Sequence, residues 1–201
     1  MSAPLDLPTA SPTEPPVEPP VEPRRVQRVP ERWPVVHLEA EVPQWSGLVV
    51  DGMVAHARRF DLAALRALGA EERTIDFHCV WGWSRPQERW TGVGLDRVLA
   101  LAGPAGPGAS HVCVTAASDD YSACIPMEVA ARGFLAWARD DRPLPPLEGG
   151  PLRFVPPPEL WAYKGVKWAA RVTLSDRFVA GFWESRIGDP AGVIPHAVVL
   201  P

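Results

Sequence analysis

The sequence predicts a single α+β domain that is mostly β. Its apolar segments are short and bounded by glycine and proline, which is typical of strands joined by turns. The helical patterns are too short and too few for an alternating βαβ fold. With 201 residues, 46% of them hydrophobic, and 9 tryptophans, the chain can bury one sizeable core but is short for two independent domains.

The N-terminal segment differs in composition from the rest of the chain. Ten of the 25 prolines precede Val35, in stretches such as SPTEPPVEPPVEPRR that offer few apolar side chains to bury. This composition predicts a disordered, proline-rich tail over residues 1–32 and a folded domain over residues 33–201. A solvated tail is the simpler interpretation, and a peptide ligand for a proline-reading domain is the alternative.

Five elements are expected in the first half of the domain. They are a strand with a turn over 47–54, a short helix over 62–68, a strand over 73–80, a loop over 82–94 and a second short helix over 95–103. Asp61 is a suitable N-cap for the first helix, and Gly69 ends it.

The second half predicts further strands. They are expected over 111–117 and 121–126, joined by a polar turn over 118–120, then over 152–155, and finally as a long strand over 164–175. Prolines and glycines interrupt the chain around the strand at 152–155. We find no internal repeat, so a single mixed domain remains the prediction.

Charge and hydropathy exclude several classes of function. The formal net charge of −4 and the scattered Lys and Arg residues give no basic surface for a nucleic acid. No run approaches the roughly 18 apolar residues of a membrane span, and the N-terminus has neither an apolar signal region nor a twin-arginine signal. The sequence therefore predicts a soluble protein in the cytoplasm.

The chain has three cysteines, Cys79, Cys113 and Cys124. This odd number, without CxxC spacing, argues against a disulfide framework and against a structural zinc site. We therefore expect all three thiols to be reduced, with Cys113 and Cys124 packed in the core.

The strand over 73–80 leads into the stretch FHCVWGWS, which holds the first candidate for chemistry. Alternation along this strand places Ile75, Phe77 and Cys79 on one face and Asp76 and His78 on the other. Cys79 stands at the end of the strand, just before two tryptophans. It is a candidate metal thiolate or nucleophile, with an inert packed thiol as the alternative.

Other polar residues are weaker candidates when each is taken alone. Lys164 and Lys167 would face opposite sides on a strand, whereas on a tight loop Gly165 would let both approach one anion. His37 follows the proline-rich segment, and a lone histidine is more often structural than a ligand. Tyr121 begins a strand, where a tyrosine more often packs than reacts.

Taken in order, several segments between Trp33 and Asp189 resemble the molybdopterin-binding domain of sulfite oxidase and its short bacterial relatives. DFHCVWGWS is similar to the family's metal-binding strand end, RWTGVGLDRVL to the entry to the next helix, and SDDYSACIPMEVA to the segment with an active-site tyrosine. GGPLRFVPP and ELWAYKGVKWAARVTL resemble an arginine-bearing strand and a phosphate-gripping loop. PVVHLEAEVP is similar to the segment that ends in a pterin-contacting histidine.

The resemblance implies a fold, a cofactor and a set of site residues. The fold would have mixed sheets and a few short helices, and the cofactor would be molybdenum-molybdopterin. Cys79 would be the only protein ligand to the metal, and Tyr121 the active-site tyrosine. The pterin phosphate would be held by the loop Lys164, Gly165, Val166 and Lys167, and the pterin would contact His37.

Elementary chemistry agrees with this implication. A solitary cysteine suits a metal that brings its own sulfur ligands, because a protein zinc site would need three or four. A phosphate in a partly buried cleft is costly unless lysines and backbone N–H groups meet it. The expected activity is two-electron oxygen-atom transfer on a small substrate, with electrons exchanged with an unidentified partner.

One departure from the family bears on the substrate. Sulfite oxidases carry arginines close behind the cysteine, whereas here Val80 to Ser84 precede Arg85. We therefore expect an apolar pocket suited to a sulfoxide or N-oxide rather than to sulfite, with the direction of transfer open. The alternatives are an inactive family member that acts as a binding or partner module, and a metal-free thiol enzyme.

Overall fold

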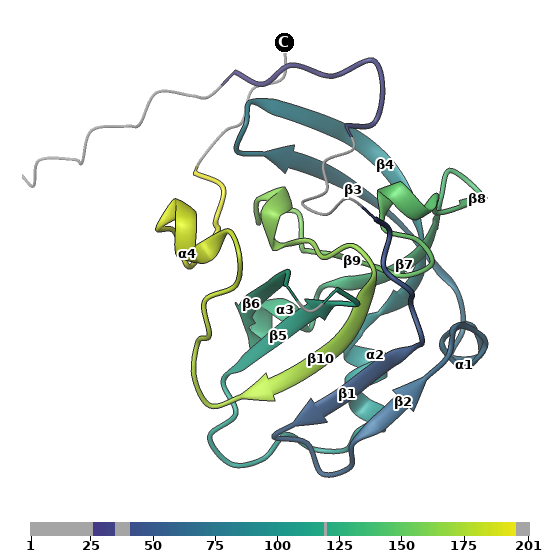
Figure 1. Cartoon of the computed structure of the whole chain (residues 1–201), viewed down its shortest axis with the longest axis vertical. Helices are drawn as coiled ribbons and strands as arrows, with labels where there is room; N and C mark the ends of the chain where they lie inside the picture. The colour runs from purple at the N-terminus through teal and green to yellow at the C-terminus, as the bar shows by residue number, and fades with distance from the viewer. Residues whose placement is uncertain (1–25, 35–40, 119, 196–201) are drawn as a thin grey trace, which may run out of the picture.

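The computed structural model describes residues 26–34, 41–118 and 120–195. Most of its regular structure is β, arranged in two sheets with a few short helices around them (Figure 1). The predicted α+β, mostly β fold is therefore confirmed.

The first sheet is mixed, and its five strands are ordered β2-β1-β10-β5-β6. Their bounds, in that order, are Arg58–Phe60, Leu48–Gly52, Ala169–Ser175, His111–Ala116 and Ser122–Pro126. β1 and β10 pair in parallel, and the other neighbours pair antiparallel. We refer to it as the mixed sheet.

The second sheet is antiparallel and runs β3-β4-β7-β8, with β9 also pairing with β7. The bounds are Glu71–Cys79 for β3, Trp83–Gly94 for β4, Phe134–Arg139 for β7, Arg142–Pro143 for β8 and Arg153–Val155 for β9. Apolar side chains from both sheets form the main core, in which Val50, Val93 and Phe154 are fully buried. A second apolar cluster, which includes Phe77 and Trp90, lies within the antiparallel sheet.

The helices are short. They are α1 (Leu62–Ala67), α2 (Leu95–Leu101), α3 (Met127–Ala130) and α4 (Glu184–Ile187), with single 3-10 turns η1 (Pro146–Glu148) and η2 (Ala162–Lys164). The Asp61 side chain accepts a hydrogen bond from the backbone of Ala64, which confirms it as the cap of α1. Over the described ranges, the structure has no helix with the length and apolar character needed to cross a membrane.

The expected loop over 82–94 is wrong, because these residues form β4, a twelve-residue strand. In the sequence, Pro86 and the polar residues around it are typical of a loop. In the structure, the pairing of β3 with β4 shifts register between Ile75 and Phe77, where Gln87 has a positive φ of 56°. The Asp76 carboxylate accepts a hydrogen bond from the Gln87 backbone at this bulge, which allows a proline within the strand.

The expected long strand over 164–175 is also shorter than predicted. Regular pairing begins only at Ala169, because residues 162–164 form η2 and the chain then bends through Trp168, whose φ is 50°. Residues 164–167 were expected either on a strand or in a tight loop, and the structure shows the loop.

The expectation of three reduced thiols is wrong for two of them. Cys113 in β5 and Cys124 in β6 are directly opposite each other and form a disulfide. Eleven positions separate them, and only the register of the antiparallel pair brings them together. The cytoplasmic location stays a prediction, and the disulfide removes one argument for it, since such bonds persist in oxidising compartments.

The proline-rich tail was expected to run to residue 32, but its last residues pack on the folded domain. Residues 26–34 are described, and Gln27 among them is completely buried. The backbone of Arg28 pairs in parallel with Trp83, so this segment packs on the start of β4. Residues 1–25 lie outside the described part of the chain.

Candidate functional site

The two sheets and η2 meet around a pocket. Cys79 enters it from the end of β3, Tyr121 from the start of β6, Arg153 from β9, and Gly165 and Lys167 from the loop after η2. Together with its solvent-open mouth, the pocket spans about 920 Å³ of space, so it is a partly open cleft rather than a closed cavity.

Cys79 has a half-buried thiol that lines the pocket. It has the one free thiol among the three cysteines, it is half-buried, and it shares the pocket with Phe77 of the same strand face. Burial raises the pKa of the Cys79 thiol, and a hydrogen bond from the Trp81 backbone partly opposes this. His78 lies on the other face, where its Nδ1 contacts Ser84 Oγ at 2.6 Å, so it cannot serve Cys79 as a base.

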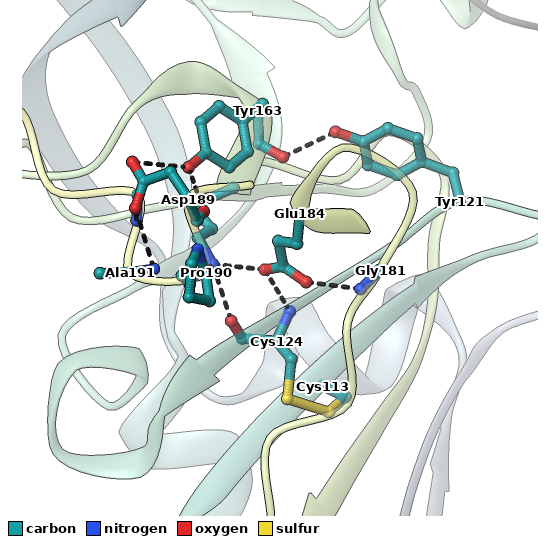
Figure 2. Close-up of polar contacts among 11 residues, drawn as sticks. Cys113, Tyr121, Cys124, Tyr163, Gly181, Glu184, Asp189, Pro190 and Ala191 are labelled. Carbon is teal, nitrogen blue, oxygen red and sulfur yellow. Dashed lines mark hydrogen bonds and ion pairs between the residues drawn. A yellow bond between two sulfur atoms is a disulfide. The ribbon is translucent and has the colours of Figure 1, made fainter. Parts of the chain in front are cut away.

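Tyr121 lies between the pocket and the loop after η2. Its hydroxyl donates a 2.6 Å hydrogen bond to the carbonyl oxygen of Tyr163, as Figure 2 shows. Burial raises the pKa of the Tyr121 phenol well above its usual range, with further contributions from Glu184 and Cys79. Tyr121 is therefore a neutral phenol at physiological pH, with its proton engaged on the loop.

The four predicted phosphate-loop residues divide into two pairs. Gly165 and Lys167 line the pocket. Val166 is fully buried and pairs through its backbone with Phe154. Lys164 is also fully buried, and its Nζ donates to the carbonyl oxygens of Cys124 (2.9 Å) and Pro190 (2.6 Å) and to the carboxylate of Glu184.

The position of Lys164 bears on its expected role. An ammonium group has three N–H donors, and here all three have protein acceptors. Desolvation lowers the pKa of Lys164, and Glu184 opposes this shift. In this arrangement Lys164 supports the loop from behind and has no donor left for a phosphate in the pocket.

Arg153 is a pocket residue to which the sequence analysis assigned no role. It is 6% exposed, its guanidinium lies over the rings of Phe77 (5.1 Å) and Trp33 (5.7 Å), and its Nε has no hydrogen-bond partner in the described part of the chain. Burial lowers the pKa of Arg153 to about 10. The signal in the sequence was an arginine inside the apolar run LRFV, because an arginine is rarely buried unless it is paired.

Lys167 lies close enough to Arg153 for the two cations to affect each other. Burial and the charge of Arg153 lower the pKa of Lys167 to about 8, while Glu148 opposes the shift. The pocket walls are mostly apolar, as expected, and Arg153 and Lys167 are the two cations among the described residues that line them. His37, the predicted pterin contact, lies outside the described residues.

The walls of the pocket are mostly aromatic, with Trp33, Trp81, Trp83, Trp168 and Trp183 among them. Trp81 is 55% exposed and packs edge-on against Trp183 at 5.7 Å. In the described part of the chain, His, Cys, Asp and Glu side chains form no group of three or more that could hold a metal ion. A metal at Cys79 would therefore need ligands from another molecule.

Comparison with known proteins identifies the family. The model of the oxidoreductase molybdopterin binding domain matches residues 34–183. The chain is 32% identical over 165 residues to the uncharacterized oxidoreductase YuiH of Bacillus subtilis (strain 168), a match that covers 79% of this chain and 81% of that protein.

A solved structure has the same fold. The sulfane dehydrogenase SoxCD from Paracoccus pantotrophus matches with a TM-score of 0.58 and 21% identity, over 71% of this chain. The match spans 40% of the SoxCD chain, so the two share a domain rather than a whole protein. Because the family model covers most of the sequence and a relative matches over its length, this chain belongs to the sulfite oxidase-type family of molybdopterin-binding oxidoreductases.

Proposed function

We propose that this protein is a molybdenum-cofactor-dependent oxidoreductase that performs two-electron oxygen-atom transfer on a small substrate, with Cys79 as the only protein ligand to the metal. One observation carries the proposal. A free, half-buried thiol lines a pocket that is also lined by the two cations Arg153 and Lys167. A catalytically inactive scaffold has no physical need to keep these three groups together.

The residues present fit the cofactor. A molybdenum centre already bound by a pterin dithiolene needs one more soft, anionic ligand, and the Cys79 sulfur can supply it. The guanidinium of Arg153 and the ammonium of Lys167, both from residues that line the pocket, are suitable donors for the anionic groups of the pterin. We assign the phosphate mainly to Lys167 beside Gly165, with Val166 and Lys164 supporting the loop from the core.

When bound, the cofactor supplies a metal that changes its oxidation state by two electrons as an oxygen atom passes between water and substrate. The protein positions the substrate and excludes bulk water. Tyr121 keeps its proton, because burial raises its pKa, and its hydroxyl hydrogen-bonds to the carbonyl of Tyr163. When the hydroxyl turns away from this carbonyl, the same O–H can donate to the oxygen that is transferred, and we assign it that contact.

The pocket favours substrates with a polarised oxygen on a small apolar body. Arg153 provides a positive charge for the oxygen, and the tryptophan walls provide apolar surface for the remainder. Sulfite, sulfoxides and N-oxides all have such an oxygen. Two electrons must be exchanged with a separate electron-transfer partner, and His37 remains our predicted pterin contact.

The test is the metal and pterin content of protein made in a host that synthesises molybdopterin. We expect about one molybdenum and one pterin per wild-type chain, and loss of molybdenum in Cys79→Ser. The matched control is the double variant Cys113→Ser/Cys124→Ser, which removes two sulfurs away from the pocket and should retain the metal.

The same preparations distinguish the proposal from its alternative. Wild-type protein that is folded but free of molybdenum would contradict the enzyme function and support a binding or partner module. With metal present, a screen of sulfite, a sulfoxide and an N-oxide against artificial electron donors and acceptors identifies the substrate and the direction of transfer.

A further inference from the structure

The segment 26–30 lies against the hairpin that carries Cys79. The backbone N–H of Arg28 donates to the carbonyl of Gly82 at 3.2 Å, and the backbone N–H of Ser84 donates to the carbonyl of Arg28 at 2.9 Å. Figure 1 shows this segment, in purple, alongside β3 and β4. A stretch from a proline-rich region thereby adds a short parallel pairing to the start of β4.

Gln27 is the one fully buried side chain in this segment, and its amide is engaged at both ends. Its Nε2 donates to the carbonyl oxygen of Cys79 at 3.0 Å, and its Oε1 accepts from Ser84 Oγ at 2.5 Å. Its neighbours Val26 and Val29 are 68% and 45% exposed. Burial of a glutamine between exposed residues is costly unless both ends of its amide are bonded, as they are here.

The donor and acceptor roles along this network are fixed by its last member. The carbonyl of Cys79 can only accept, so the amide nitrogen of Gln27 must face it and the amide oxygen must face Ser84. The Ser84 hydroxyl then donates to Gln27, and it accepts from Nδ1–H of His78. A continuous chain of hydrogen bonds thus runs from His78 through Ser84 and Gln27 to the backbone of Cys79.

The carbonyl of Cys79 is therefore held from two sides. The N–H of Gly82 donates to it within the turn at 3.0 Å, and Gln27 donates to it from outside the hairpin. Gln27 thus adds a second bond to the one that Gly82 donates at this carbonyl. The second bond comes from a residue 52 positions earlier in the sequence.

We propose that Gln27 is a positioning residue for Cys79, and that residues 26–30 form a strap that fixes the direction of the thiol into the pocket. The role in metal binding rests on the proposed function of Cys79. The effect on the thiol itself does not, because the hydrogen bonds join protein groups only.

The test measures the reactivity of Cys79 in cofactor-free, non-reduced protein, in which Cys79 is the one free thiol. We compare the rate of iodoacetamide alkylation in wild type, Gln27→Ala and the matched control Val26→Ala. Loss of one ordinary hydrogen bond should raise the alkylation rate about fivefold in Gln27→Ala, measured well below the melting temperature of the variant. Val26→Ala should react like wild type.

Ser84→Ala is a second variant, which breaks the Ser84–Gln27 hydrogen bond and keeps residues 26–30 unchanged. It should also raise the alkylation rate of Cys79. Hydrogen exchange of the wild-type chain gives a measurement without any substitution. The amide of Arg28 should be protected together with those of Gly82 and Ser84 in the turn. Exchange of the Arg28 amide at the rate of an unstructured chain, or equal alkylation of Gln27→Ala and Val26→Ala, would overturn the strap.

The molybdenum content of the same variants separates the two proposals. With metal in wild type, reduced loading in Gln27→Ala supports the strap, and normal loading together with normal alkylation contradicts it. Absence of metal from wild type would contradict the proposed function, whereas the alkylation rates would still decide the role of Gln27.

Discussion

The protonation of Lys167 controls how strongly the pocket attracts an anion. Burial and the neighbouring charge of Arg153 bring the pKa of Lys167 to about 8, while Glu148 opposes the shift. A lysine with this pKa is mostly charged at about pH 7 and mostly neutral at about pH 9. Arg153, with a pKa of about 10, stays largely charged over the same interval.

We therefore predict that the cofactor-free pocket binds sulfate up to about tenfold more weakly at pH 9 than at pH 7, because the cation is lost as the pH rises through the pKa of Lys167. Sulfate does not itself titrate in this range, and isothermal titration calorimetry measures its affinity. Lys167→Arg keeps its charge and should show little pH dependence. Equal affinity of the wild type at both pH values would contradict the assignment.

Single residues also show which parts of the site can be predicted from sequence. The direction of Cys79 was predictable, because the alternation of Ile75, Phe77 and Cys79 is a local property of a strand. The burial of Lys164 in a salt bridge was not predictable, because its partner Glu184 is distant in the sequence. The burial of Gln27 was not predictable either, because the proline-rich composition of its segment predicts disorder.

At the scale of elements, the C-terminal segment around α4 holds the pocket loop in place. The Glu184 carboxylate accepts from Lys164 and from the backbone N–H groups of Cys124 (2.9 Å) and Gly181 (2.6 Å). The hydroxyl of Tyr163 donates to the carbonyl of Asp189 at 2.8 Å. Figure 2 shows these contacts gathered beside Tyr121, so the segment after β10 clamps η2 against β6.

We predict that Glu184→Gln destabilises the fold by about 3–5 kcal/mol, because it leaves the ammonium of Lys164 buried without its counter-charge. Urea unfolding followed by tryptophan fluorescence measures the loss. The matched control, Glu128→Gln on the exposed surface of α3, should stay within about 0.5 kcal/mol of wild type.

A double variant tests whether charge is the cause. Replacing both members, as Lys164→Met/Glu184→Leu, should recover only part of the stability. It removes the unpaired charge, but it leaves the backbone groups of Cys124, Gly181 and Pro190 without these partners. A single variant as stable as wild type would show that water or another group reaches Lys164.

Elements were predictable from sequence where one local signal dominates. The helix α1 has an aspartate cap and a terminal glycine, and both signals are confirmed. The strand β4 was missed because Pro86 lies at a bulge, and a bulge is defined only by the partner strand. The loop after η2 was left undecided for the same reason, since the backbone pairing of Val166 with Phe154 is long-range.

At the scale of the whole molecule, the pocket depends on how the two sheets meet. Cys79 belongs to the antiparallel sheet and Tyr121 adjoins the mixed sheet, so the two residues line one pocket only if the sheets keep their relative placement. The core shared by both sheets provides this, and the disulfide between β5 and β6 adds a covalent constraint at the edge of the mixed sheet.

We predict that the purified, non-reduced chain has one reactive thiol when it is denatured, and three after reduction, as measured with a chromogenic thiol reagent. The reason is that Cys113 and Cys124 pair across β5 and β6, which leaves Cys79 free. Reduction should lower the stability by about 2–3 kcal/mol, the value expected for opening a loop closed by cysteines 11 positions apart. Three thiols before reduction, in protein purified from its own host, would contradict the disulfide and favour a reducing compartment such as the cytoplasm. One thiol would favour an oxidising compartment, where any electron partner would also have to reside.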